Sequence, residues 1–204
     1  MIETLLTLLF GIIVILAIIA ANGYFVAQEF AYMAVDRTRL SALAATGDAA
    51  AKRALAVTKR TSFMLSGAQL GITVTGLMVG YVAEPLVGES AGILLMGTGM
   101  TEATGITVGT VMALVVATVV QMVAGELYPK NLAIANPEPM SRALARSTLL
   151  YMSVFGWFIS FFDKSANVLL RMLRIEPVHD LDVSASAEDL PHIIANSRDS
   201  GDLP

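Results

Sequence analysis

Acidic and oxygen-bearing groups occur inside otherwise apolar stretches of this 204-residue chain. Glu126 follows the uncharged run from Thr107 to Ala124. Because Pro129 has no N–H, the carbonyl of Gly125 loses its usual helical partner beside the Glu126 side chain. A free carbonyl next to a carboxylate is a pair of hard oxygen ligands, the type that Mg2+ or Ca2+ binds. The block from Gly125 to Lys130 equally fits a helix end at the membrane surface, with Glu126 and Lys130 in water.

A second acid, Glu29, lies in the first apolar stretch on the same helical face as Asn22. An ionised carboxylate deep in lipid costs about 3 kcal/mol or more, so we expect Glu29 to bind a cation or to exchange a proton. The alternative is a position near the inner interface, where Glu29 reaches water close to Asp36.

Neutral oxygen groups recur on the second and third apolar stretches. Ser66, Gln69 and Thr73 share one helical face of the second stretch, and Gln121 lies on the third. Such groups can line an ion site, or they can be interhelical hydrogen bonds worth about 0.6 kcal/mol each. The predicted cation site therefore consists of the following residues: Glu126, Glu29, Gly125, Gln69, Thr73, Ser66 and Gln121.

The composition indicates an integral membrane protein, because 55% of residues are apolar, 15% are charged and the mean hydropathy is +0.69. A net charge of -4 argues against a nucleic-acid partner. The lack of cysteine excludes disulfides and thiolate metal sites. His179 and His192 are the only histidines and form no His-Glu-x-x-His pattern, which excludes a zinc metalloprotease of that type. We expect no enzyme.

The elements that must position these residues are three membrane spans, at about residues 5–35, 62–82 and 107–126. The basic segment 36–60 predicts two short cytoplasmic helices parted at Gly47-Asp48, whereas 83–105 carries acids and no base and is expected outside. The N-terminus would then lie outside the cell membrane and the C-terminus in the cytoplasm. Glycine pairs at Gly67 and Gly71, Gly76 and Gly80, and Gly105 and Gly109 have the spacing for close helix contact.

A fourth apolar run, 147–162, lies within a juxtamembrane region at 137–174 and has basic residues on both sides. It predicts a re-entrant or interfacial helical hairpin turning near Gly156-Trp157, with a fourth span as the alternative. The polar, acidic segment 176–204 predicts a linker toward a further cytosolic domain. The fold class is therefore an all-α membrane protein with juxtamembrane amphipathic helices, and residues 1–175 form the membrane domain.

Four segments together resemble the membrane domain of the CorC and cyclin M (CNNM) transporters. They are Asn22-Gly-Tyr-Phe-Val-Ala-Gln-Glu-Phe-Ala31, Gln69-Leu-Gly-Ile-Thr73, Gly125-Glu-Leu-Tyr-Pro-Lys130 and the tail from Ala187 to Gly201. The resemblance implies a homodimer in the lipid bilayer with three spans per subunit, a cytoplasmic belt of helices, and a cytosolic CBS-domain pair after the tail. It also implies a path for a divalent cation, which is Mg2+ for export in CorC. Glu126 and Glu29 carry over as the acids of the site.

Two positions depart from the pattern of magnesium-handling members. Val26 stands where those members carry a serine, and Gly71-Ile72 stands where they carry a Gly-Asn pair. The loss of a hydroxyl and an amide oxygen weakens the case for Mg2+, which needs near-octahedral oxygen coordination. Gln69, Thr73 and Gln121 could supply replacement oxygens, or the substrate is a different cation. The alternative function is a dimeric membrane anchor or scaffold for a cytosolic sensing domain.

Overall fold

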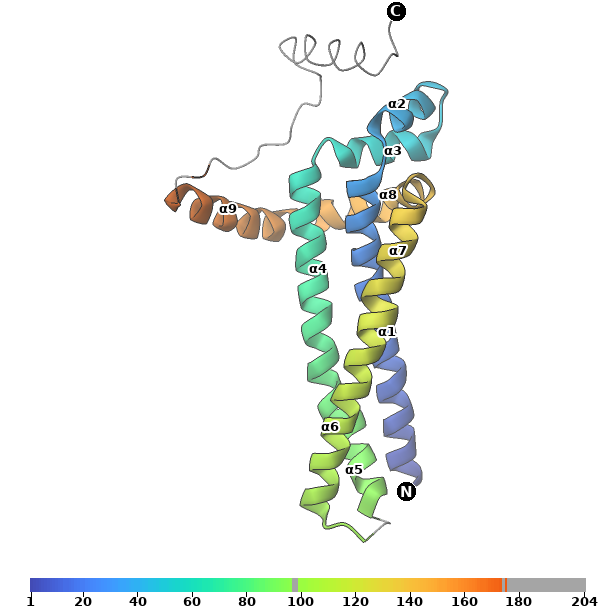
Figure 1. Ribbon diagram of the computed structural model, residues 1–204, viewed down its shortest axis with the longest axis vertical. Helices are drawn as coiled ribbons and strands as arrows, with labels where there is room; N and C mark the ends of the chain where they lie inside the picture. Colours follow the sequence, from blue (N-terminus) through green and yellow to red (C-terminus); the bar gives the residue numbers. More distant parts are fainter. Residues whose placement is uncertain (97–98, 174, 176–204) are drawn as a thin grey trace, which may run out of the picture.

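Three long helical rods form the body of the protein in the computed structural model, which describes residues 1–96, 99–173 and 175 (Figure 1). The first rod is α1 (Ile2–Ala34). The second joins α4 (Thr61–Val82), η1 (Ala83–Gly88) and α5 (Glu89–Leu95), and the third joins α6 (Glu102–Val120), η3 (Gln121–Leu127) and α7 (Tyr128–Ala135). Within the described residues, these three rods are long and apolar enough to cross a membrane. The predicted all-α membrane fold is confirmed.

Four further helices form a belt at one end of the rods, opposite the N-terminus (Figure 1). The belt consists of α2 (Arg37–Ala45), α3 (Ala49–Thr58), α8 (Pro137–Val154) and α9 (Gly156–Met172). The predicted break between the first two is confirmed. Gly47 takes the left-handed conformation at φ +97°, which glycine adopts without steric cost. Asp48 then begins α3 by accepting the N–H groups of Ala50 and Ala51.

The run 147–162 does not form one straight helix, because α8 and α9 are bent by 79°. The break lies at Phe155, next to the predicted turn at Gly156-Trp157. The predicted bent helical pair is confirmed, and its two helices open at 79° instead of folding back on each other. By length and composition the pair could still count as one broken span, but α9 runs across the long axis of the rods (Figure 1). Trp157 and Phe161 are exposed on α9, as in a helix that lies in a membrane interface.

The second rod is longer than the predicted span at 62–82, because the helix continues to Leu95. Pro85 cannot donate a backbone hydrogen bond, and the chain widens around it into the π-helical turn η1, where the N–H of Glu89 reaches the carbonyl of Glu84. The acidic stretch after residue 82 therefore begins as a helix. A tight contact joins it to the third rod, since a Cβ on Gly109 would lie 2.5 Å from the carbonyl oxygen of Gly88.

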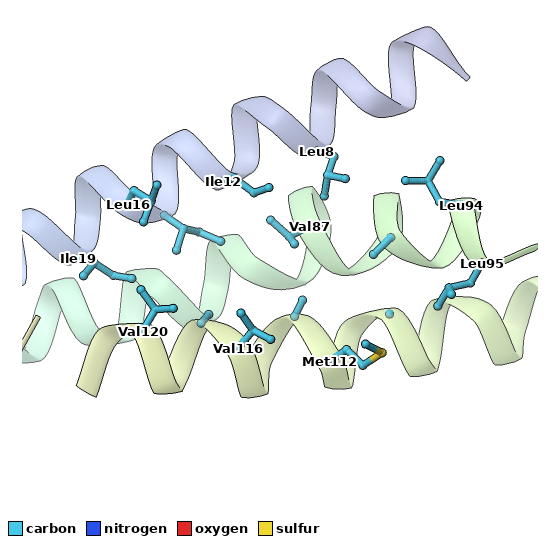
Figure 2. Close-up of a pocket in the computed structure, with 15 residues that line it drawn as sticks. Leu8, Ile12, Leu16, Ile19, Val87, Leu94, Leu95, Met112, Val116 and Val120 are labelled. Carbon is cyan, nitrogen blue, oxygen red and sulfur yellow. The ribbon is translucent and has the colours of Figure 1, made fainter. Parts of the chain in front are cut away.

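An apolar groove of about 480 Å³ separates α1 from α5 and α6 at the end of the bundle away from the belt (Figure 2). Its walls are aliphatic side chains, with Met112 as the one sulfur-bearing group drawn in the view. Residues such as Leu16, Val87 and Val116 line it. The side chains that line this groove offer no oxygen ligand to a cation.

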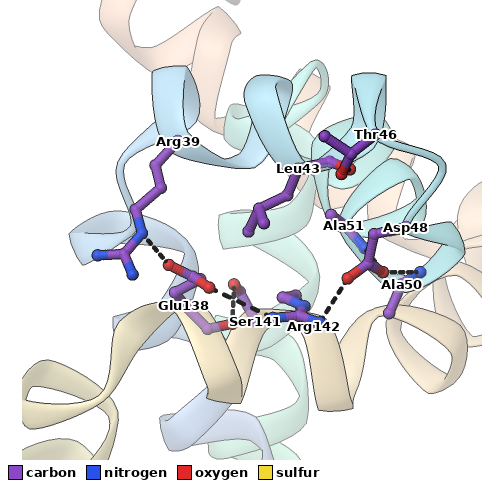
Figure 3. A network of polar contacts seen from close by, with 9 residues as sticks. All are labelled: Arg39, Leu43, Thr46, Asp48, Ala50, Ala51, Glu138, Ser141 and Arg142. Atoms are coloured by element: carbon purple, nitrogen blue, oxygen red, sulfur yellow. Dashed lines mark hydrogen bonds and ion pairs between the residues drawn. The ribbon is translucent and has the colours of Figure 1, made fainter.

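Ion pairs attach the α2–α3 hairpin to α8 (Figure 3). Arg142 of α8 contacts Asp48 at 2.5 Å and Glu138 at 3.3 Å, and Arg39 of α2 contacts Glu138 at 2.5 Å. Asp48 uses one oxygen for the helix cap and the other for Arg142. The hydrogen bond from the Ala51 N–H, followed by that from Ala50 and the charge of Arg142, lowers the pKa of Asp48.

This lowered pKa predicts that acid weakens the contact between α3 and α8. The stabilisation from Asp48 is present above its unfolded pKa, close to the ordinary 3.8, and is lost as the pH falls through the lower folded value. Asp48→Asn keeps a capping oxygen but loses the charge, so it should be less stable than wild type at neutral pH and equally stable in strong acid. Melting temperatures of wild type and Asp48→Asn from neutral pH to strong acid measure the difference, with a substitution at exposed Glu3, Glu3→Gln, as the control. A constant difference between wild type and Asp48→Asn would contradict the prediction.

Candidate functional site

Asn22 joins the three rods at one buried point. Its side chain is fully buried in α1. The amide nitrogen donates to the Gly125 carbonyl of η3 at 3.0 Å, and the amide oxygen accepts from the Thr75 hydroxyl of α4 at 2.7 Å. The Thr75 hydroxyl also lies 2.7 Å from the Gly71 carbonyl and 3.1 Å from the Ile72 carbonyl, so three acceptors compete for its single proton. Asn22 thereby sets the mutual position of the spans.

The helix does not end at the block from Gly125 to Lys130, as the sequence had predicted, but continues through α7 to Ala135. The π-helical turn η3 precedes Pro129, with the N–H of Tyr128 bonded to the carbonyl of Val123. Pro129 then falls in the first turn of α7, where a missing N–H costs little. The Gly125 carbonyl, expected to be free, receives the Asn22 amide instead. π-helical turns within helices are frequent at functional sites.

Glu29 is half-buried and faces α4. The Gln69 amide of α4 donates to Glu29 at 2.8 Å. One turn earlier on α4, the Ser66 hydroxyl donates to Asp163 of α9 at 2.9 Å, and the Asn167 amide donates to the other oxygen of Asp163 at 3.2 Å. The carboxylates of Glu29 in α1 and Asp163 in α9 therefore both contact the polar face of α4.

A groove of about 670 Å³ runs along this face between α4 and α9. Its α4 wall is mixed, with Leu65, Leu70 and Val74 beside polar residues, and its α9 wall is aromatic at Phe158 and Phe162. Polar lining comes from Ser62, Ser66, Gln69 and Thr73. Three of the predicted site residues, Ser66, Gln69 and Thr73, therefore share one open cavity next to Glu29.

The remaining predicted residues lie on the third rod. Gln121 is half-buried, and its amide nitrogen lies 3.3 Å from the position of a Cβ on Gly76, so it packs over α4. Glu126 is exposed on η3. Lys130 lies 4.9 Å from the ring of Phe30, so its ammonium group stacks on α1. In a single chain, Glu126 is thus on the outer surface while Glu29 faces inward to α4.

Acidic and histidine side chains do not gather in groups of three or more that could hold a metal ion anywhere in the described ranges. A cation bound here would therefore need amide, hydroxyl or carbonyl oxygens besides one or two carboxylates. The polar face of α4 offers such oxygens at Ser66, Gln69 and Thr73.

Residues 12–204 match the family described as the cyclin M transmembrane N-terminal domain. The chain belongs to this family.

Curated relatives of this cyclin M domain occur in several bacteria. An uncharacterized protein of Mycobacterium tuberculosis, Rv1841c, is 34% identical over 191 residues, which cover 94% of this chain and 54% of the relative. The UPF0053 protein MT1890 of the same species is 38% identical over 94% of this chain and 42% of its own length. The UPF0053 protein YugS of Bacillus subtilis is 30% identical over 96% and 46%. The chain spans about half the length of these relatives.

The two departures from the magnesium pattern have clear positions in this cyclin M domain. Val26 is buried at 4% exposure and contributes only methyl groups. Ile72 is half-buried, and its carbonyl lies 3.1 Å from the Thr75 hydroxyl. Neither side chain supplies an oxygen. The tail motif from Ala187 to Gly201 and the predicted linker lie outside the described residues, so the division at residue 175 stays a prediction.

The sequence did not predict two residues that form polar contacts in the cyclin M domain, Asp163 and Thr75. Asp163 sits in the basic flank of an apolar run, and nothing in its spacing links it to Ser66. Thr75 lies outside the stripe of Ser66, Gln69 and Thr73, and its interhelical role is shown by its burial at 8% exposure and its hydrogen bond to Asn22. Periodicity can place a residue on a helix face, but it cannot name the residue opposite.

Loss of the Asn22 amide is expected to destabilise the domain. Asn22→Leu leaves the buried Gly125 carbonyl without this donor, whereas Thr75 keeps backbone acceptors, so we expect a loss of about 2–3 kcal/mol. Unfolding of the purified protein in one detergent measures the loss. Asn131→Leu, at an exposed position of α7, is the control and should change stability by less than about 0.5 kcal/mol. Equal stability of the two variants would show that Asn22 does not hold the rods together.

Proposed function

We propose that this domain carries a divalent cation across the bilayer and binds it on the polar face of α4. The observation that supports this most is the line of polar contacts from Glu29 through Gln69 and Ser66 to Asp163. Each of its two carboxylates accepts a hydrogen bond from a residue, Gln69 or Ser66, that lines a groove together with Thr73. Carboxylate, amide and hydroxyl oxygens are the ligands that Mg2+ and Ca2+ take in proteins.

The energetic cost of Glu29 supports a functional role. A carboxylate in a membrane-spanning helix costs about 3 kcal/mol or more when it faces lipid. A hydrogen bond from the neutral Gln69 amide offsets part of this cost but brings no positive charge. A passing cation or a proton would neutralise Glu29, which makes the site suited to exchange rather than to permanent binding.

Exposed Glu126 supports a homodimer. On η3 it lies among exposed Met122, Val123 and Leu127, so in a bilayer a single chain would present the carboxylate to lipid. We expect a second copy to cover this face and to bring Glu126 and Gln121 into the cation path. CBS domains that follow the tail would control the movement of the rods.

The distribution of basic residues supports a cytoplasmic belt. Every lysine and arginine in the described ranges lies in the belt, in α7 or in the connection from α3 to α4. The opposite end carries Glu3, Glu84, Glu89 and Glu102. By the positive-inside rule, the N-terminus then lies outside the cell membrane and the belt in the cytoplasm.

The proposed substrate is a divalent cation. Mg2+ is the first candidate, and Mn2+ and Ca2+ are the alternatives. Val26 and Ile72 remove two neutral oxygens, and Mg2+ tolerates an incomplete octahedron less well than Ca2+, which accepts flexible geometry. The neutral oxygens of α4 that can take their place belong to Ser66, Gln69 and Thr73, because Ser66 and Gln69 donate hydrogen bonds and keep the lone pairs of their oxygens.

The competing function is a membrane anchor for a cytosolic sensing domain. It is favoured by the lack of a group of three acidic or histidine side chains in the described part of the chain. In that case the contacts of Asn22, Gln69 and Ser66 are packing interactions only.

Calorimetric titration of the full-length protein with Mg2+, Mn2+ and Ca2+ separates the two functions. Transport predicts saturable binding of at least one ion, which is lost in both Glu29→Gln and Glu126→Gln because each removes a negative charge without a large change in volume. Glu84→Gln, at an exposed acid on the far end of the second rod, should bind like wild type. Identical titrations for wild type and both site variants would leave the anchor as the function.

A further inference from the structure

One face of α1 turns toward the belt helix α8. Tyr24, Gln28 and Tyr32 follow one another at intervals of one helical turn and therefore share this face. The Tyr32 hydroxyl donates to the backbone carbonyl of Ser141 in α8 at 2.9 Å. The ring of Phe25 lies 5.1 Å from that of Tyr151, also in α8. Gln28, between these contacts, thus points into the interface of α1 and α8.

Gln28 is fully buried in this interface. Neither its amide nitrogen nor its amide oxygen meets a hydrogen-bond partner among the described residues, and the buried hydroxyl of Tyr24 lacks one as well. Buried side-chain amides are nearly always bonded, either to protein or to ordered water. The three atoms therefore require a ligand that can both donate and accept.

The facing side of α8 is also polar in part. Ser141 and Thr148 are both fully buried there, and the Thr148 hydroxyl lies beside that of Tyr32. The cluster of Tyr24, Gln28 and Thr148 thus combines hydroxyls with an amide. It contains no charged group.

We propose that this cluster is a hydrated site, in which ordered water bridges Gln28 to Tyr24 and to α8. Water accepts from the amide nitrogen and donates to the amide oxygen, so it satisfies both ends of Gln28. A metal cation would bind the oxygens but would be repelled by the amide N–H groups. A hydrocarbon chain would satisfy none of them.

The site makes the contact of α1 with α8 different from its contact with α7. Toward α7, Ala27 and Ala31 pack against Ala133 in an apolar cluster that Met140 and Leu144 of α8 also touch. On the α8 side, a water layer replaces part of the direct packing. Water-mediated hydrogen bonds then supplement the direct contacts of Tyr32 and Phe25 that hold α8 to α1.

Radiolytic hydroxyl-radical footprinting of the full-length protein in lipid nanodiscs tests the proposal, since radicals formed from bound water modify neighbouring side chains. Tyr24 should be modified several-fold more than Tyr32, which is buried at 2% exposure and has a paired hydroxyl. Gln28→Leu should lower the modification of Tyr24 several-fold. Gln121→Leu, which removes an amide at a different helix contact, should leave it unchanged.

Equal modification of Tyr24 and Tyr32 in wild type would overturn the proposal, whether or not Gln28→Leu folds. Unchanged Tyr24 modification in a folded Gln28→Leu variant would overturn it too. The footprinting is repeated in buffers with and without Na+ or Mg2+ to test whether a cation occupies the site. Protection of Tyr24 that rises with the ion concentration would assign the site to a cation instead of water.

Discussion

Cation flux through proteoliposomes is expected to fall by about tenfold or more when Glu29 is replaced by glutamine, because an interaction of 1.4 kcal/mol already corresponds to a factor of ten. Glutamine is nearly isosteric with glutamate and can still accept the hydrogen bond from Gln69. The helix contact of α1 with α4 is therefore kept, while the negative charge that attracts a cation is removed. Flux of Mg2+, Mn2+ and Ca2+ into or out of the vesicles is the measurement.

Glu126→Ala is the second arm of this experiment and is expected to abolish the flux without unfolding the protein. The side chain is exposed in the single chain, so its truncation removes no packing contact within the subunit. Glu84→Ala, which removes an exposed acid at the far end of the second rod, is the matched control. Equal flux in wild type and in both site variants would exclude a role for these acids in transport.

Much of this architecture could be predicted from hydropathy and charge, because the physics of a bilayer acts on whole segments. An uninterrupted apolar run can only be a helix in lipid, and the basic segment at 36–60 can only lie in water. The break at Gly47-Asp48 was also predictable, since glycine and a capping aspartate act locally.

The helix ends could not be predicted in the same way. Pro129 was expected to stop a helix and the second span was expected to end near residue 82, yet at Pro129 and at Pro85 a π-helical turn accommodates the missing hydrogen bond and the helix continues. At Pro129, the outcome depends on a tertiary partner, because the Asn22 amide takes the Gly125 carbonyl that a straight helix would leave without a bond. Local sequence rules carry no information on a partner so distant along the chain.

The candidate site was predictable by residue type but not by pairing. Ser66, Gln69 and Thr73 were assigned to one face from their spacing, and they do line one groove. Asp163, which completes the polar line with Ser66, belongs to α9, whose position depends on the 79° bend at Phe155. The position of Glu126 in the assembly depends on a second subunit and stays a prediction.

Close packing of glycines is expected to contribute as much to stability as the buried Asn22 amide. The spacing of Gly105 and Gly109 predicted a tight helix contact, and the structure shows its partners to be Gly92 and Gly88. A methyl group on Gly109 would lie 2.5 Å from the Gly88 carbonyl oxygen and 2.6 Å from the Gly92 nitrogen. Both are backbone atoms, so no side-chain rotation can relieve the clash, and η1 and α5 must move away from α6.

Gly109→Ala should therefore destabilise the domain by about 2–3 kcal/mol, at the upper end of overpacking effects. Gly80→Ala is the matched control, because a Cβ there meets no atom within 4 Å and alanine favours a helix by about 0.5–1 kcal/mol. The two variants add the same methyl group to a span and should shift unfolding in one detergent in opposite directions. If Gly109→Ala unfolded no earlier than Gly80→Ala, α5 would not be packed against α6 as closely as the structure shows. The groove between α1, α5 and α6 would then not keep the shape seen in the structure, because α5 forms one of its sides.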